Sequence, residues 1–232
     1  MRQYFVTGTG TGIGKTAVTT ALCWQLRQQG RSVTGLKPLI SGYDPQDMHS
    51  DSALILRSCG ITPSPEAAAA ISPWRYSAPL SPNMAAWKEG APVSLDELVT
   101  FCRDYAAMAP DVVLVEGVGG VMVPLNDDHT VLDWMQQLGW PVLLVTGSYL
   151  GSISHTLTAA LALHSRGIPL HAVLISESEG GISLDDTAAT LEGHLPKNHG
   201  RAGLPVVKIR RTGPGKGELW ERMPLLSGLC EE

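Results

Sequence analysis

Residues 8–16 read GTGTGIGKT and follow directly on the short apolar run YFVT. A strand that ends in a glycine-rich turn and leads into a helix can bind phosphate, because glycines let successive backbone N–H groups turn inward. Lys15 can then reach the outer phosphates of a nucleoside triphosphate, and the Thr16 hydroxyl suits a magnesium ion. The strict motif GxxxxGK[ST] has glycine where this chain has Thr9, and Gly8 lies one residue earlier. The stretch predicts a P-loop, and the simpler alternative is a glycine-rich turn with an incidental lysine.

Strand and helix patterns alternate along the rest of the chain. Continuous apolar runs at 112–117 and 141–147 end in glycine and are typical of strands covered on both faces. Further strands are expected at 32–36, 171–176 and 204–209, and helices at 15–29, 50–59, 94–105, 131–137, 152–166 and 185–192. Residues 61–82, rich in proline, serine and alanine, are expected to be loop with short turns. This order predicts an α/β P-loop fold with a mainly parallel sheet, helices on both faces, and one domain over 1–232.

One helix carries a more detailed prediction. Ile153, Leu157, Leu161 and His164 recur at helical spacing within residues 152–166. Side chains at this spacing share one side of a helix, so we expect these four on a common side.

Composition limits the classes of partner. The net charge is −5, and no basic tract is longer than KIRR, which argues against sequence-independent binding of nucleic acid. No apolar run approaches the ~20 residues of a membrane span, and no signal-peptide pattern opens the chain. The cysteines are scattered and form no CxxC pair: Cys23, Cys59, Cys102 and Cys230. Thiols in this pattern favour a reducing compartment, so we expect a soluble cytoplasmic protein without nucleic-acid or membrane partners.

Polar residues follow the ends of several predicted strands, where ligands bind in open parallel sheets. Lys37 and Ser41 come after residues 32–36, and Glu116 ends the run at 112–117. Taken singly, Lys37 could point into solvent and Asp51 could offset a helix dipole. Glu116 ends a buried strand, where an unpaired carboxylate is unfavourable, so a nearby cation is expected. Two lysines, two carboxylates and a threonine together predict a magnesium-triphosphate site for phosphoryl transfer.

Six segments of the chain resemble a known family. In order, they are YFVTGTGTGIGKT, GLKPLISG, SDSALIL, APLSPNMAA, VVLVEGVGGVMVPL and LLVTGSYLGSISHT. Their order and spacing are similar to those of dethiobiotin synthetases, and they cover about residues 3–175. The resemblance implies ATP- and magnesium-dependent joining of carbon dioxide to 7,8-diaminopelargonate, which closes the ureido ring of dethiobiotin in biotin biosynthesis. It also implies a seven-stranded, mainly parallel sheet and a homodimer whose subunits share the substrate site.

The resemblance implies roles for individual residues. The implied magnesium ligands are Thr16, Asp51 and Glu116, and the implied catalytic residues are Lys37, Lys15 and Thr11. Nucleotide contacts are implied for Gly12, Ile13, Gly14, Lys15, Thr16, Ala17, Asp51, Glu116, Gly117, Val118, Gly119, Ser176 and Glu177. Substrate contacts are implied for Ser41, Gly151, Ser152, Ile153 and Ser154, the last four serving the neighbouring subunit.

The chain also departs from the family pattern. Gly10 stands where P-loops of the family usually have aspartate, and Gly12 where they often have an acidic or polar residue. An Asn-Asp pair that contacts adenine in the family is here Ser176-Glu177, so we expect weaker selection for the adenine base.

Three other functions use similar sequence features. An amidating synthetase acting on a cobalamin precursor would normally have a further glutamine-handling domain. A partitioning ATPase begins its P-loop with a lysine, whereas this chain has Gly10. A nucleotide-binding regulatory module would not need Lys37 and Ser41. A requirement for both bicarbonate and diaminopelargonate would separate the synthetase from all three.

Overall fold

A six-stranded parallel sheet forms the centre of the computed structural model, which describes residues 2–195, 203–213 and 215–230. Its strands run in the order β2-β5-β1-β6-β7-β8. They are β1 (Arg2–Gly8), β2 (Val33–Leu36), β5 (Val112–Glu116), β6 (Val142–Gly147), β7 (Leu170–Ser176) and β8 (Val206–Ile209). The predicted fold class is confirmed, but this sheet has six strands in the described residues rather than seven.

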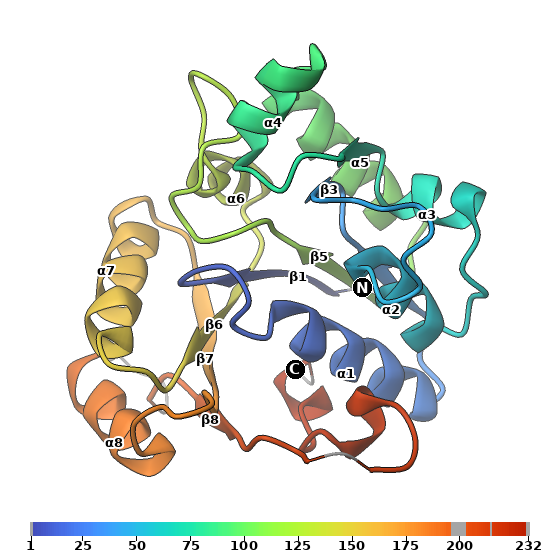
Figure 1. Ribbon diagram of the computed structural model, residues 1–232. Helices are drawn as coiled ribbons and strands as arrows, with labels where there is room; N and C mark the ends of the chain where they lie inside the picture. Colours follow the sequence, from blue (N-terminus) through green and yellow to red (C-terminus); the bar gives the residue numbers. More distant parts are fainter. Residues whose placement is uncertain (1, 196–202, 214, 231–232) are drawn as a thin grey trace.

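Helices cover both faces of the sheet (Figure 1). One face packs against α1 (Lys15–Gln28), and the other packs against α5 (Leu95–Ala107), α6 (Val131–Leu138), α7 (Ser152–Ser165) and α8 (Leu184–His194). The alternation of side chains along β1 explains both contacts, since Tyr4 and Val6 pack with α1 whereas Phe5 packs on the opposite face. Phe5 meets Trp134 of α6 edge to face, with ring centroids 4.9 Å apart.

The loop prediction for 61–82 was wrong. Helix α3 (Pro65–Ile71) and strand β4 (Trp74–Tyr76) lie within it, and α4 (Pro82–Glu89) begins at its end. Strand β4 pairs in parallel with β3 (Leu39–Ser41) as a separate two-stranded sheet. Serine followed by proline begins both helices, because proline suits the first helical turn. In α3, Ser64 accepts a hydrogen bond from the Ala67 N–H.

The side of α7 that is buried differs from the side predicted by the spacing of its apolar residues. Ile153 and Leu157 are half-buried, while Leu161 is 65% exposed and His164 is exposed. The buried side instead carries small and hydroxyl residues with one leucine: Ser152, Thr156, Ala159, Ala160 and Leu163. Small side chains let a helix approach a sheet closely, so apolar spacing alone did not identify the packed side.

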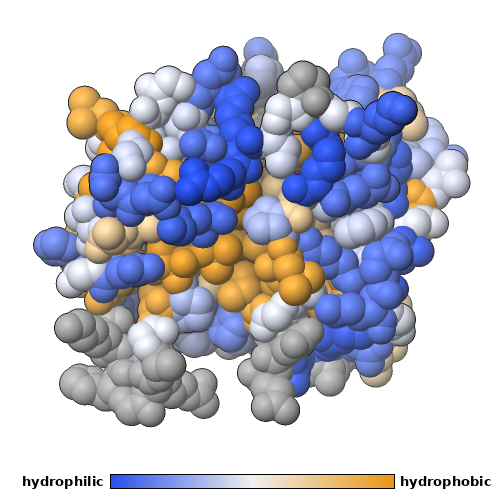
Figure 2. Space-filling model, turned by 90° about the horizontal axis from the view of Figure 1, so that it is seen from below, coloured by the Kyte–Doolittle hydropathy of each residue, from blue (hydrophilic) through white to orange (hydrophobic). Residues whose placement is uncertain are grey.

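The C-terminal segment packs beneath α1. It contains two short 3-10 helices, η1 (Leu219–Arg222) and η2 (Ser227–Cys230). Gln25 of α1 donates to the Pro224 carbonyl at 2.8 Å, and its Oε1 accepts from the Leu226 and Ser227 N–H groups. Hydrophobic residues gather at the centre of the face seen from below, with hydrophilic residues around them (Figure 2). No helix in the described residues is long and apolar enough to cross a membrane.

Candidate active site at the carboxyl ends of the strands

The glycine-rich turn lies between β1 and α1, at the carboxyl edge of the sheet. Gly12 and Gly14 have φ of +71° and +100°, a backbone conformation that side chains with a Cβ rarely adopt. Gly14 is the N-cap of α1 and has no side chain to cap the first turn, so the helix N–H groups there can bind an anion. Lys15 folds back over the turn and donates to the Gly10 carbonyl at 2.7 Å. The turn therefore has the conformation expected of a phosphate-binding loop.

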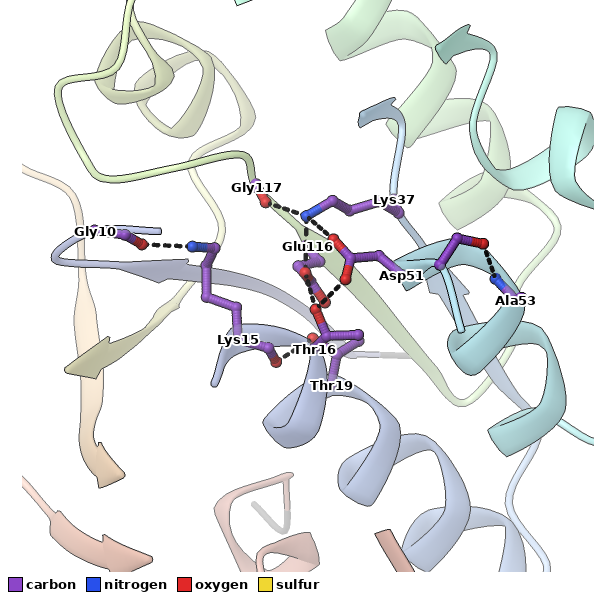
Figure 3. A network of polar contacts seen from close by, with 10 residues as sticks. Gly10, Lys15, Thr16, Thr19, Lys37, Asp51, Ala53, Glu116 and Gly117 are labelled. Carbon is purple, nitrogen blue, oxygen red and sulfur yellow. Dashed lines mark hydrogen bonds and ion pairs between the residues drawn. The ribbon is translucent and has the colours of Figure 1, made fainter. Parts of the chain in front are cut away.

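Four charged or hydroxyl side chains meet beside this loop (Figure 3). The Thr16 hydroxyl lies 2.7 Å from Asp51 Oδ1 and 2.8 Å from Glu116 Oε1. Lys37 Nζ lies 2.8 Å from Glu116 Oε1 and 3.1 Å from Asp51 Oδ2, and it also donates to the Gly117 carbonyl at 2.9 Å. These residues come from α1, the end of β2, the start of α2 (Asp51–Ser58) and the end of β5. We call this set the Lys37 network.

The strand register explains why the network forms. In the sheet, Glu116 of β5 pairs with Val6 of β1, two residues before the glycine-rich turn begins at Gly8. Leu36 of β2 pairs with Val115, so Lys37 follows at the same edge. Because all these strands are parallel, residues far apart in the sequence are brought to one end of the sheet.

Glu116 is the most deeply buried member of the network. Its exposed fraction is 0%, and that of Lys37 is 3%. Glu116 Oε1 is bonded to both Thr16 and Lys37, whereas Oε2 is buried and has no partner among the described residues. A buried carboxylate oxygen without a partner is unfavourable, so the site suits a further cation.

The donor set fits magnesium. Two carboxylates and one hydroxyl are hard oxygen ligands, and magnesium commonly binds through one or two carboxylates together with substrate phosphates. Within the described part of the chain, no three His, Cys, Asp or Glu side chains gather closely enough to hold a metal ion. A cation bound at Thr16, Asp51 and Glu116 would therefore keep positions open for phosphate oxygens.

The network shifts the pKa values of its members. Burial acts to lower the pKa of Lys37, but the charges of Glu116 and Asp51 outweigh it, and the pKa is raised. Burial acts to raise the pKa of Asp51, but Lys37 and the Thr16 hydroxyl hold it below its usual value. For Lys15, burial and the nearby Lys37 charge lower the pKa to about 8. Lys37 is thus firmly held as a cation, whereas Lys15 is only weakly held as one.

A cavity of about 780 Å³ opens beside these groups. It is lined by Thr11, Gly12, Gly14, Lys15, Thr16, Lys37, Ile40, Ser41, Asp51, Pro79, Leu80, Ser81, Pro82, Met84, Glu116, Val118, Gly119 and Val123. Its volume falls within the ~300–1,000 Å³ of small-molecule sites. One cavity thus joins the glycine-rich turn, the Lys37 network and Ser41.

Other residues singled out from the sequence lie outside that cavity lining. Ile13 and Ala17 belong to the loop and α1, and Gly117 contributes only its carbonyl to Lys37. Ser176 lies under the loop, since a Cβ placed on Gly14 would be 3.1 Å from Ser176 Oγ.

Two further groups lie elsewhere on the same edge. The Glu177 carboxylate accepts a hydrogen bond from the Arg211 N–H at 2.8 Å. Residues 151–154 begin α7 and do not line the cavity within this single chain.

The comparisons with known proteins agree with this geometry. A family model described as "AAA domain" matches residues 2–206. The chain is 50% identical over 223 residues to "ATP-dependent dethiobiotin synthetase BioD" of Caulobacter sp. strain K31, covering 95% of this chain and 91% of the relative. It is 45% identical over 225 residues to the protein of the same name from Methylobacterium nodulans, covering 94% and 97%. This chain belongs to the dethiobiotin synthetase family.

Solved structures show the same fold in more distant proteins. The MinC:MinD complex of Aquifex aeolicus aligns with a TM-score of 0.52 and 12% identity, covering 84% of this chain and 79% of that chain. Chloroplast FtsY of Physcomitrella patens aligns with a TM-score of 0.51 and 16% identity, covering 98% of this chain and 63% of that chain. At such low identity the likeness concerns the fold alone. The names of the curated relatives do not favour the partitioning ATPase or the amidating synthetase.

The dethiobiotin synthetase resemblance contained one signal that sequence reasoning left unused. Pro79, Leu80, Ser81, Pro82 and Met84 line the cavity, and all belong to the matched segment APLSPNMAA. No role is predicted for them from the sequence, since residues 61–82 are expected to be loop and Met84 lies just beyond that stretch. Ile40 and Val123 also line the cavity, and nothing in their immediate sequence marks them.

Proposed function

We propose that this chain is an ATP-dependent cyclo-ligase that converts 7,8-diaminopelargonate, carbon dioxide and ATP into dethiobiotin, ADP and phosphate in the cytoplasm. The single observation that carries the proposal is that the glycine-rich turn and the Lys37 network face one cavity. An ATPase switch needs the glycine-rich turn. Lys37 is a second buried lysine that faces the same cavity, and this suits an enzyme that must bring a second anion to the triphosphate.

Thr16, Asp51 and Glu116 would hold the magnesium ion. When bound, magnesium neutralises phosphate charge and so favours phosphoryl transfer. Lys37 shares the two carboxylates, with Nζ 2.8 Å from Glu116 and 3.1 Å from Asp51. The strength of these ion pairs depends on the negative charge of Asp51 and Glu116. Because the same two carboxylates would bind the magnesium ion, Lys37 and the metal site are coupled.

Lys15, Lys37 and Thr11 would surround the reacting groups. One substrate amine adds to carbon dioxide and gives a carbamate, whose oxygen attacks the γ-phosphorus of ATP and displaces ADP. The second amine then attacks the carbon of the resulting carbamic-phosphoric anhydride, and phosphate leaves as the ring closes. Both lysines line the cavity, where their charges offset the repulsion between carbamate and triphosphate.

The remaining contacts concern the nucleotide and the substrate. The phosphates would lie against residues 12–17, and Gly117, Val118 and Gly119 would flank the nucleotide. Ser41 lines the cavity and would contact diaminopelargonate. Ser176 and Glu177 are the nearest candidates for the base.

We further infer that the active unit is a homodimer, in which Gly151–Ser154 bind the distant carboxylate of the partner's substrate. Residues 151–154 do not line the cavity of their own chain, and the helix that they begin could hold a carboxylate at its N-terminus. Apolar side chains near this helix are exposed: Leu150 is 90% exposed, Leu161 65% and Met122 58%. Light scattering at assay concentration tests the dimer, and a fully active monomer would contradict it.

The deciding experiment is a turnover assay on the purified chain. We expect release of phosphate from ATP to require both bicarbonate and 7,8-diaminopelargonate, with dethiobiotin identified by mass spectrometry. Hydrolysis of ATP at the same rate without diaminopelargonate would contradict the proposal and point to an ATPase switch.

A further inference from the structure

A second cavity lies at the β2 edge of the sheet, away from the proposed active site. Its volume is about 340 Å³, and none of its lining residues lines the larger cavity. Gly35 of β2, Ile71 of α3 and Tyr105 of α5 form part of its wall. Cys59, the C-cap residue of α2, lines it as well and is half-buried. Cys59 is therefore not fully enclosed by the protein.

Cys23 meets Cys59 over Gly35. A Cβ atom placed on Gly35 would lie 2.8 Å from Cys23 Sγ and 3.3 Å from Cys59 Sγ, so both sulfur atoms face the space left by this glycine. The two thiols are thus near neighbours, and each shifts the pKa of the other. Cys23 itself is fully buried in the middle of α1.

The surroundings shift the pKa values of the two thiols in opposite directions, so that Cys59 ionises more readily than Cys23. The Cys23 hydrogen bond, the Gly35 N–H, the Arg27 charge and the Ser58 hydroxyl lower the pKa of Cys59, although burial opposes them. The hydrogen bond to Cys59, together with burial, raises the pKa of Cys23. A half-buried thiol among hydrogen-bond donors, next to a second thiol, has the properties of an oxidation-sensitive cysteine.

We propose that Cys59 and Cys23 are a modification site, oxidised by hydrogen peroxide to a disulfide that joins α2 to α1. The Cys59 thiolate attacks one peroxide oxygen, the O–O bond breaks, and the departing hydroxide takes a proton to become water. Cys59 is then a sulfenic acid. The Cys23 sulfur attacks the Cys59 sulfur, the S–O bond breaks, and the hydroxide leaves as water with the Cys23 proton. Peroxide is reduced by two electrons, and the two thiols are oxidised by two.

The link would join two elements of the proposed active site. Helix α1 begins with Lys15 and Thr16, and α2 begins with Asp51. A covalent bond between these helices fixes their relative position, on which the contact of Thr16 with Asp51 depends.

The test uses the reduced, folded chain and graded hydrogen peroxide, followed by alkylation of remaining thiols and peptide mapping by mass spectrometry. We expect a Cys23–Cys59 cross-linked peptide that a thiol reductant removes. Cys102 is the internal control, because it is fully buried in α5 and burial raises the pKa of its thiol. Cys59 should react at least about tenfold faster than Cys102.

Two variants separate the roles of the pair. Cys23→Ser should abolish the cross-link and let dimedone, which traps sulfenic acids, label Cys59. Cys59→Ser should leave Cys23 reduced at the same peroxide concentration, and Cys102→Ser should form the cross-link as wild type does. A Cys23–Cys230 cross-link in wild type, or Cys59 reacting no faster than Cys102, would overturn the proposal. None of these measurements depends on turnover, so they stand apart from the synthetase proposal.

Discussion

The phosphate end and the base end of the proposed nucleotide site are built very differently. At the phosphate end, Lys37 and Glu116 are buried, and contacts of 2.8–3.1 Å hold them to their neighbours. At the base end, the one hydrogen bond of the Glu177 carboxylate among the described residues comes from the Arg211 N–H, and Arg211 pairs with the exposed Glu179. Both ends lie along one edge of one sheet. The difference suggests that the fold holds the reacting groups rigidly and leaves the choice of base weakly constrained.

The largest effect on turnover is expected for Lys37→Gln, at the phosphate end. The change removes the buried cation that would face the developing phosphoanhydride, by analogy a loss of ~3–4 kcal/mol, or roughly 10²–10³ in turnover rate. Binding of magnesium-ATP should change little, because Lys15 and the loop remain. Lys88→Gln is the control, since Lys88 is exposed on α4. Turnover near that of wild type would remove Lys37 from the mechanism, provided circular dichroism shows a folded variant.

Glu116→Gln tests whether the Lys37 network supplies a magnesium ligand. The amide keeps the shape of the side chain but loses the charge that a magnesium ligand supplies. We expect the magnesium concentration for half-maximal turnover to rise by roughly 10–100-fold, while the KM for diaminopelargonate changes less. Glu192→Gln is the matched control, because Glu192 is exposed on α8. An unchanged magnesium titration would mean that Glu116 is not a ligand.

The two lysines should respond differently to pH. Because the pKa of Lys15 is lowered to about 8, Lys15 is a cation below that pH and loses its charge above it. The triphosphate stays anionic, so its affinity should fall as pH rises above about 8, by up to roughly tenfold per pH unit. In Lys15→Arg the charge persists, and the decline between pH 8 and 9.5 should disappear. Equilibrium binding of magnesium-ATP across this range gives the answer, and an identical decline in the variant would exclude Lys15 as its source.

The smallest effect is expected at the base end, in the preference for ATP over other nucleoside triphosphates. Ser176 is too short to contact both polar positions on the adenine edge, and an ionised Glu177 can only accept hydrogen bonds. ATP should exceed CTP and GTP in kcat/KM by less than the ~10–200-fold value of one bidentate contact, about 1–3 kcal/mol. The comparison is made at fixed magnesium and diaminopelargonate. A preference of about a thousandfold would show that other groups read the base.

The phosphate end could be predicted from the sequence because the patterns that mark it are local. Apolar runs that end in glycine mark the buried strands, and parallel strands bring Lys37 and Glu116 to one edge. The individual contacts of Lys37 with Asp51 and Glu116 depend on side-chain packing between distant elements, so no local pattern could specify them.

The errors have physical causes as well. Ser64-Pro65 and Ser81-Pro82 resemble loop sequences, yet proline at the first turn begins helices α3 and α4. The buried side of α7 was predicted wrongly because it consists mainly of small and hydroxyl residues, which give little hydrophobic signal in the sequence. Expectations for Ser176 and for residues 151–154 stay predictions, since they concern a nucleotide and a second subunit.

The central place of β1 in the sheet also bears on how the chain is made. Its neighbours are β5 and β6, so β1 has both partners only once residue 147 of 232 has been synthesised. Pairing over such a separation must overcome the entropy of closing a long loop. Before that point, β1 can pair only with β5, so the turn that follows Gly8 is supported from one side of the strand. During synthesis, the glycine-rich turn would therefore emerge well before β6, the strand that completes the sheet on its other side.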